Sequence, residues 1–166
     1  MNAFWSYFWP AIGIGVVVGI VAGAVAFRTR RRRNPALAVG AVLTIALAAL
    51  WHGPLGAADR FSAEVERSIR ATTVYNLIPQ VSGHLHHGPL TRHVILSGPA
   101  DDFQRSQLVF LMDDLSGVES ASWSPGAGGP PLIVEGAIAA ILGFLFGLLV
   151  AYLRELRRRY NAQWNW

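Results

Sequence analysis

Five arginines occur within the six residues from Arg28 to Arg33, and long apolar segments flank this cluster on both sides. An arginine at the centre of a bilayer costs about 2.5 to 3.5 kcal/mol on insertion scales, so the cluster must lie at a membrane surface. Short loops rich in Lys and Arg stay on the cytoplasmic side. The cluster therefore predicts a cytoplasmic loop between two membrane-spanning helices.

A second basic block follows the last apolar segment of the chain. If three segments cross the membrane, both blocks fall on the same side, which is an internal check on the topology. A solvated basic surface or a nucleic-acid patch is the other interpretation, but the adjoining apolar segments favour the membrane. The residues predicted to set topology and contact lipid head groups are Arg28, Arg30, Arg31, Arg32, Arg33, Arg154, Arg157, Arg158 and Arg159.

The composition agrees with a membrane protein, because 52% of the 166 residues are hydrophobic and they are concentrated in blocks. The chain has no cysteine, which excludes disulfides and thiolate chemistry. The formal net charge of +4 is segregated, since residues 52–131 carry five arginines against eight acids, a net −3. The positive charge therefore suits anionic lipid at one membrane face and predicts no nucleic-acid partner.

Three spans are expected, with the N-terminus outside. The first span opens with aromatic residues, and its positive charge follows the apolar core, whereas a secretory signal peptide has the charge in front. The expected organisation is a transmembrane helix over 1–27, a cytoplasmic arginine loop over 28–34, a second helix over 35–54, a periplasmic domain over 55–124, a linker over 125–131, a third helix over 132–153 and a cytoplasmic tail over 154–166.

Small residues recur every four positions in all three apolar segments. Such rows let helix backbones approach closely in a membrane, so we expect them to pack against one another or against a partner. The residues predicted to form these faces are Gly15, Gly19, Gly23, Gly40, Gly143 and Gly147.

The region 55–131 is the only part expected to fold outside the membrane. Phe61, Val65 and Ile69 predict a helix that runs to about Leu77 and is ended by Pro79. The segment 80–88 and a strand over 92–97 are expected to form a hairpin with a turn near 88–89.

A second helix of this region should begin at Asp101, which forms a capping box with Gln104. Gly117 is expected as its C′ residue, and a last strand follows over 118–124. The fold class is thus an α-helical membrane protein with a small α+β domain of order αββαβ.

This region resembles the BON domain family. The resemblance covers about residues 60–124 and rests on a strand ending in a Leu-x-Gly element, a helix, and a Gly-Val pair before the closing strand, matched by Leu96, Gly98, Gly117 and Val118. The resemblance implies an αββαβ fold, an envelope location and contact with phospholipid. It carries no catalytic residues.

The histidines are the only cluster with candidate chemistry: His84, His86, His87 and His93. A metal site is geometrically possible across the hairpin, a pH-responsive surface is a second option, and a solvated polar strand is the interpretation we favour. Since no Gly-x-Ser-x-Gly or phosphate-binding loop is present, we expect no enzyme and no cofactor. We expect no metal either, because no further ligand or second shell can be assigned to the histidines. Glu135 is expected at the outer membrane interface.

Two classes of function compete for a chain of this kind. The first is a non-catalytic accessory, assembly or scaffold subunit of the bacterial inner membrane, which contacts lipid and docks other membrane subunits or further copies of itself. The second is an envelope protein that contacts phospholipid, or acts in stress, through its BON-like domain.

Overall fold

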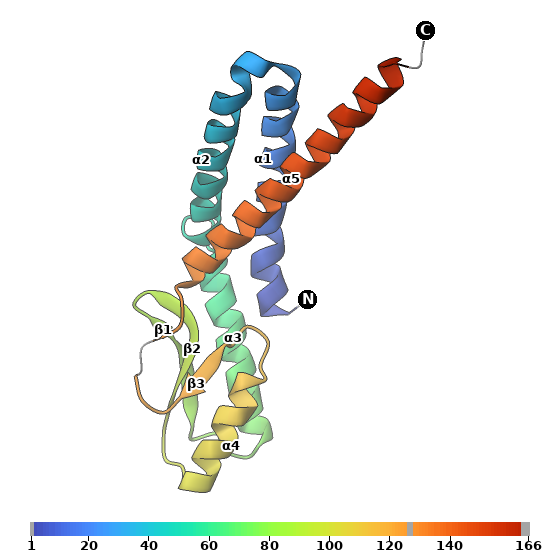
Figure 1. Cartoon of the computed structure of the whole chain (residues 1–166). Coiled ribbons are helices and arrows are strands. Elements are labelled where there is room, and N and C mark those ends of the chain that lie inside the picture. The colour runs from blue at the N-terminus through green and yellow to red at the C-terminus, as the bar shows by residue number, and fades with distance from the viewer. Residues whose placement is uncertain (1, 126–127, 164–166) are drawn as a thin grey trace. The chain divides into compact units, whose positions relative to one another are not determined.

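The computed structural model describes residues 2–125 and 128–163 (Figure 1). Its contacts divide the chain into two compact units. The sheet unit comprises Gly56–Glu135 together with the N-terminal residues up to Tyr7, and the helical unit comprises Phe8–Leu55 and the chain from Gly136 onward. The first turns of two long helices therefore belong to the sheet unit.

The long helices are α1 (Ala3–Arg28), α2 (Arg33–His52) and α5 (Leu132–Gln163), with a 3-10 turn, η1 (Arg30–Arg32), between the first two. All three are long and apolar enough to cross a membrane, which confirms the expectation of three such segments. In the helical unit α1 and α2 run antiparallel and α5 crosses α1 (Figure 1).

The chain beyond residue 153, expected as a cytoplasmic tail, is helical as far as Gln163. The helix α5 thus continues through the second arginine block. Arg, Glu, Leu and Ala all favour helix, and Glu155 pairs with Arg159 one turn later, so nothing in this segment ends the helix. The C-terminal arginines are therefore held in a fixed helical array, whereas Trp164 and Trp166 lie outside the described residues.

The sheet unit has the elements α3 (Ala57–Tyr75), β1 (Ser82–His87), β2 (Leu90–Ser97), α4 (Asp102–Asp113) and β3 (Ser120–Ser122). This is the predicted αββαβ order. The sheet order is β1-β2-β3, with β2 antiparallel to β1 and parallel to β3. A parallel pair needs a crossover, and α4 supplies it.

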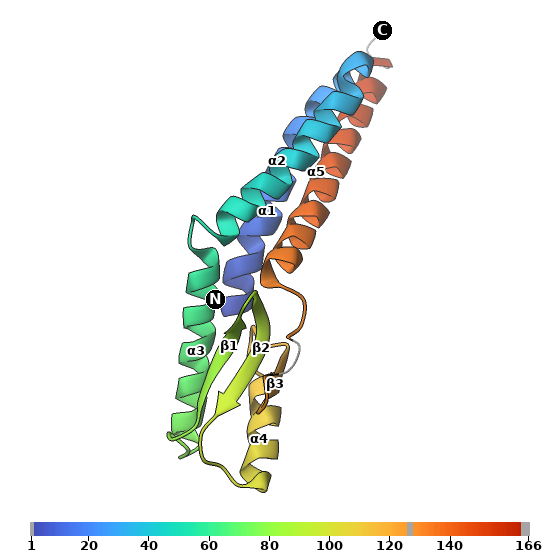
Figure 2. The ribbon, with the colours of Figure 1, turned by 90° about the vertical axis from the view of Figure 1, so that its left-hand side faces the viewer.

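One face of the sheet packs against α3 and α4, and the core lies between them (Figure 2). The fully buried side chains of this unit include Phe61, Val65, Ile69, Leu85, Val94, Leu96, Leu108 and Met112. The core contains the predicted α3 stripe, whose members recur every four residues. The expected linker over 125–131 includes Gly126 and Ala127, which lie outside the described residues.

The capping box of α4 is confirmed. Asp101 Oδ1 accepts a hydrogen bond from the Gln104 amide at 2.7 Å, and Gln104 Oε1 accepts from the Asp101 amide at 3.1 Å. The prediction for Gly117 was wrong in position, because α4 ends at Asp113 with Asp114 as its C-cap. Gly117 instead takes φ +101° in the turn before β3, where a Cβ would lie about 3.0 Å from Val65.

The end of α3 also differs from the prediction. The helix stops at Tyr75, and Leu77 takes φ 59°. The Ile78 amide donates to Thr73 O at 2.9 Å and the Leu77 amide donates to Val74 O at 3.1 Å, which is the pattern of a Schellman motif. Leu77 therefore occupies the left-handed position at which glycine is usual, and its side chain is 87% exposed.

We expect Leu77→Gly to stabilise the protein by about 1 kcal/mol, because a left-handed conformation is strained for a side chain and free for glycine. Little buried surface is lost, since the leucine is exposed. Thermal unfolding of the full chain in detergent measures the change. Leu77→Ala is the matched control, because it shortens the side chain and keeps the strain; an equal gain from both variants would contradict the explanation.

Candidate functional site

A seam of glycines joins α1 to α5 inside the helical unit. A Cβ added at Gly15 would overlap Ala140 O, and one added at Gly19 would overlap Phe144 O. From the other side, a Cβ at Gly143 would overlap Ile12 O. The two backbones are therefore in direct contact, which only glycine permits.

The small-residue row of α2 is buried in the same unit. A Cβ at Gly40 would lie 2.7 Å from Ala22 Cβ and 3.0 Å from Phe144 Cε2. Thr44 is fully buried, and its hydroxyl donates to Gly40 O at 2.9 Å. Like Gly23, which faces Ala151, these positions pack against helices of the same chain.

The outward faces of the three helices are strongly apolar. Side chains such as Val21, Val42 and Leu142 are each more than 60% exposed. A soluble protein does not leave this much apolar surface open, so these faces suit hydrocarbon or another apolar helix.

Arg92 is the centre of an ion-pair cluster in the sheet unit, and sequence reasoning did not single it out. Its Nε lies 2.7 Å from Glu135 Oε2, and its Nη2 lies 3.8 Å from Glu119 Oε2. Its guanidinium stands 5.6 Å from the centre of the Phe4 ring. The side chains of Arg92 and Glu135 are only 17% and 16% exposed. The charge of Glu135 is therefore balanced by Arg92 and is largely shielded from solvent.

Tyr7 also belongs to this unit. Its ring contacts the Phe61 ring edge-on at 5.7 Å between centroids, and its hydroxyl donates to Leu132 O at 3.3 Å. Tyr7 is 2% exposed. The aromatic start of the chain, expected at a membrane interface, thus supplies part of the sheet unit's core. The only signal for this in the sequence is the density of aromatic residues before Pro10.

The four histidines are not gathered at one point. His84 pairs in register with Ile95, and a bulge shifts β1 between Leu85 and His87. His87 Nε2 lies 3.5 Å from Glu66 Oε1. Over the described residues no group of three or more His, Asp or Glu side chains is arranged to hold a metal.

His93 is engaged at both ring nitrogens. Ser122 donates to Ser124 O at 2.6 Å, so its oxygen accepts from His93 Nε2–H at 2.9 Å. Nδ1 of the neutral ring is then the acceptor for the Ser120 hydroxyl at 2.8 Å. The cluster of His93, Ser120 and Ser122 ties β2 to β3, and among the described residues the partners of both ring nitrogens are serine hydroxyls.

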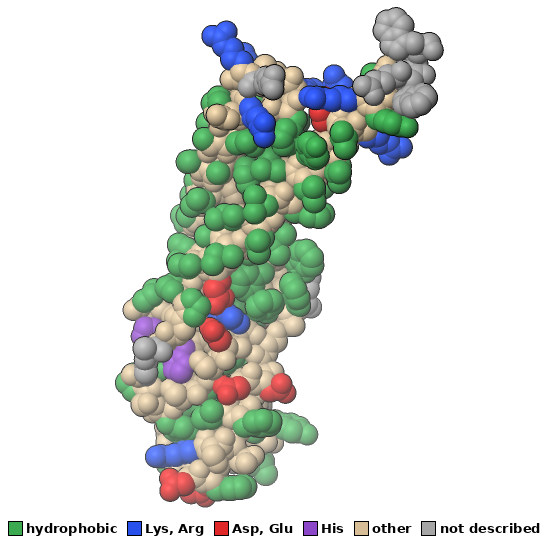
Figure 3. All heavy atoms as spheres, viewed as in Figure 1, with side chains coloured by type: hydrophobic (Ala, Val, Ile, Leu, Met, Phe, Trp, Pro, Cys, Tyr) green, Lys and Arg blue, Asp and Glu red, His purple; other side chains and the backbone are tan. Residues whose placement is uncertain are grey.

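The arginines of both basic blocks lie at one end of the helical unit (Figure 3). Arg159 Nη2 donates to Phe27 O at 3.0 Å, and its Nε lies 3.1 Å from Glu155 Oε1. Arg159 thereby satisfies a free carbonyl at the end of α1 and fastens α5 to it. The side chain of Arg30 is outside the described ones.

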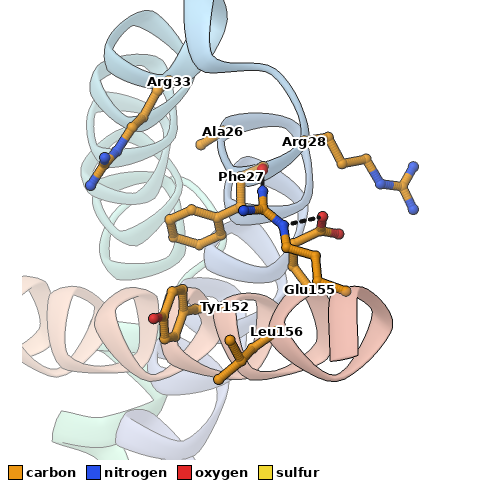
Figure 4. A pocket seen from close by; sticks show the side chains of 8 residues that line it. Ala26, Phe27, Arg28, Arg33, Tyr152, Glu155 and Leu156 are labelled. Atoms are coloured by element: carbon orange, nitrogen blue, oxygen red, sulfur yellow. Dashed lines mark hydrogen bonds and ion pairs between the residues drawn. The ribbon is translucent and has the colours of Figure 1, made fainter. Parts of the chain in front are cut away.

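A pocket of about 630 Å³ opens at this end. It lies between the last turn of α1, the first turn of α2 and the second half of α5 (Figure 4). Its walls combine three arginines with one acid and four apolar or aromatic side chains: Ala26, Phe27, Arg28, Arg33, Tyr152, Glu155, Leu156 and Arg159.

The sheet unit leaves large apolar side chains open to solvent. On α4, Phe103 and Phe110 are 74% and 73% exposed. They are seven residues apart and so share one helix face, which we call the α4 face. At the end of α3, Tyr75 and Leu77 are each 87% exposed.

Comparison with protein-family models, with curated proteins and with solved structures finds no match to this chain.

Proposed function

We propose that the chain is a non-catalytic membrane protein that serves as an accessory, assembly or scaffold subunit. The observation that carries this proposal is the α4 face, two phenylalanines exposed on a unit that has its own buried core. Exposed aromatic side chains of this size are typical of protein-binding surfaces. The predicted BON-like domain would thus act as the docking module outside the membrane.

The charge of this region favours a protein partner over phospholipid. Residues 52–131 carry a net −3, and acids stand at both ends of α4, at Asp101, Asp102, Asp113 and Asp114. Anionic lipid would be repelled by this surface. The partner that fits is a protein surface with an apolar centre and a basic rim. Phospholipid contact through the BON-like domain remains the second candidate, supported by the αββαβ order.

Three helices with apolar outward faces support placement in a bacterial inner membrane. Both arginine blocks lie at one end of the helical unit, as the rule for cytoplasmic Lys and Arg requires. We therefore place the N-terminus in the periplasm and the C-terminus in the cytoplasm. Protease added to spheroplasts should cut the sheet unit; cleavage only in inverted vesicles would reverse the orientation.

The glycine seam indicates which helix surfaces remain available to a partner within the membrane. The small-residue rows are filled by helices of the same chain, so a partner within the membrane would meet the exposed Val, Leu and Ile faces instead. The helices would form a rigid platform, and the α4 face would select the partner.

A further prediction of this proposal is loss of a partner on changing the α4 face. The full chain, extracted gently from its own membrane, should carry foreign subunits in a fixed ratio by native mass spectrometry. Phe103→Ser with Phe110→Ser should reduce their retention at least tenfold, because buried aromatic anchors dominate binding at about 2 kcal/mol or more each.

Tyr75→Ser is the matched control, since it removes an aromatic side chain that is even more exposed, at 87%, from α3. Equal retention by the double variant and the wild type would overturn docking through the α4 face. A chain that carries only phospholipid, lost in the double variant, would establish the second candidate.

A further inference from the structure

We propose that the pocket between α1, α2 and α5 binds the phosphate of an anionic phospholipid head group. This inference rests on the membrane placement proposed above and is independent of any protein partner. It concerns the helical unit alone.

The pocket has more positive charge than its own acid can neutralise. Three arginines line it, and Glu155 is the one carboxylate in its wall. Glu155 is already held by Arg159 at 3.1 Å and by Arg158 at 3.9 Å. No carboxylate of the described residues lies within ion-pairing distance of Arg28 or Arg33. An external anion is therefore the group that would complete the site.

The arrangement of side chains suits a phosphate on the Arg33 side. Figure 4 shows Arg33 above the Phe27 ring to its left and Tyr152 below the ring, whereas Arg28 points away to the right. A guanidinium fork donates two parallel hydrogen bonds to phosphate oxygens, and a tyrosine hydroxyl can donate a third. Arg33 is thus the main ligand we assign, and Tyr152, which lines the same pocket, is the second donor.

The surroundings of the pocket favour a lipid over a soluble phosphate. Tyr152 and Leu156 are about half exposed at the pocket wall, and toward the middle of α5 the exposed residues are Leu149 and Leu153. A phosphate bound at Arg33 would place its glycerol and acyl chains along this apolar face. A free phosphate would leave the face uncovered.

The experiment uses the full chain in two settings. Incorporation into vesicles of phosphatidylcholine alone, followed by flotation and carbonate washing, tests membrane placement without any anionic lipid. Native mass spectrometry then measures binding of phosphatidylglycerol and of phosphatidylcholine to the detergent-solubilised protein, with and without inorganic phosphate as competitor.

We expect selective binding of phosphatidylglycerol, and Arg33→Gln should weaken it about fivefold. Arg31→Gln is the matched control, because it removes the same charge from η1 without lining the pocket, and it should change affinity less than twofold. Equal losses in the two variants would overturn the pocket in favour of diffuse attraction. Equal binding of phosphatidylcholine, or displacement by inorganic phosphate, would overturn the anionic lipid as the ligand.

Discussion

Replacing Gly19 by leucine is expected to destabilise the helical unit by about 3 kcal/mol or more, the upper range for overpacking. The Cβ alone would overlap Phe144 O and lie 3.1 Å from Gly147 Cα. These obstacles are backbone atoms, which cannot rotate away as a flexible side chain can. α1 and α5 must therefore separate along the seam.

Gly13→Leu is the control for this prediction. It introduces the same side chain into the same helix, at a position where nothing lies within 4 Å of the added Cβ. Heating followed by size-exclusion chromatography measures the fraction of protein that remains monodisperse. If both variants lose the folded form at the same temperature, the close approach of α1 and α5 is not a source of stability.

Removing Arg92 is expected to have the second large effect. Arg92→Met should cost about 3 kcal/mol, because it leaves Glu135, 16% exposed, without its ion-pair partner. The change also removes the contact with Phe4 and so weakens the attachment of the chain's start to the sheet unit. Thermal unfolding of the full chain measures the loss.

The double variant Arg92→Met with Glu135→Gln tests the reason for that loss. Because it removes both charges, it should recover part of the lost stability, which is the sign of an unpaired carboxylate in the single variant. Arg70→Met, a change of the same chemistry at an exposed position on α3, should alter stability by less than about 0.5 kcal/mol. A double variant that is less stable than the single one would refute the explanation.

Much of the fold follows from local patterns in the sequence. Each of the correctly predicted features depends on residues that are close together in the sequence. These features are the three apolar helices, the αββαβ order and the Asp101–Gln104 capping box. The burial of Phe61, Val65 and Ile69 follows from their spacing alone. Such features need no knowledge of distant contacts.

What the sequence does not predict is long-range pairing. Arg92 and Glu135 are 43 residues apart, and Tyr7 reaches Leu132 across 125. No periodicity connects such residues. The left-handed Leu77 was missed for another reason, because Gly or Asn is the usual signal for that position and the sequence has neither at 77. The histidines are also divided between two strands, because His84, His86 and His87 lie on β1 whereas His93 lies on β2 and contacts Ser120 and Ser122.

The discontinuous make-up of the sheet unit has a consequence for biogenesis. Its core is closed by Tyr7 from the start of the chain, and its ion-pair cluster by Glu135 from the first turn of α5. The ribosome synthesises Tyr7 early in translation and Glu135 late. The sheet unit therefore stays incomplete until the first turn of α5 has been made. Until then the ion pair of Arg92 with Glu135 cannot form and the core around Phe61 is not fully closed. A chaperone could bind the exposed parts of the unit during this period. Release of the nascent chain before residue 132 should yield a product that proteases remove.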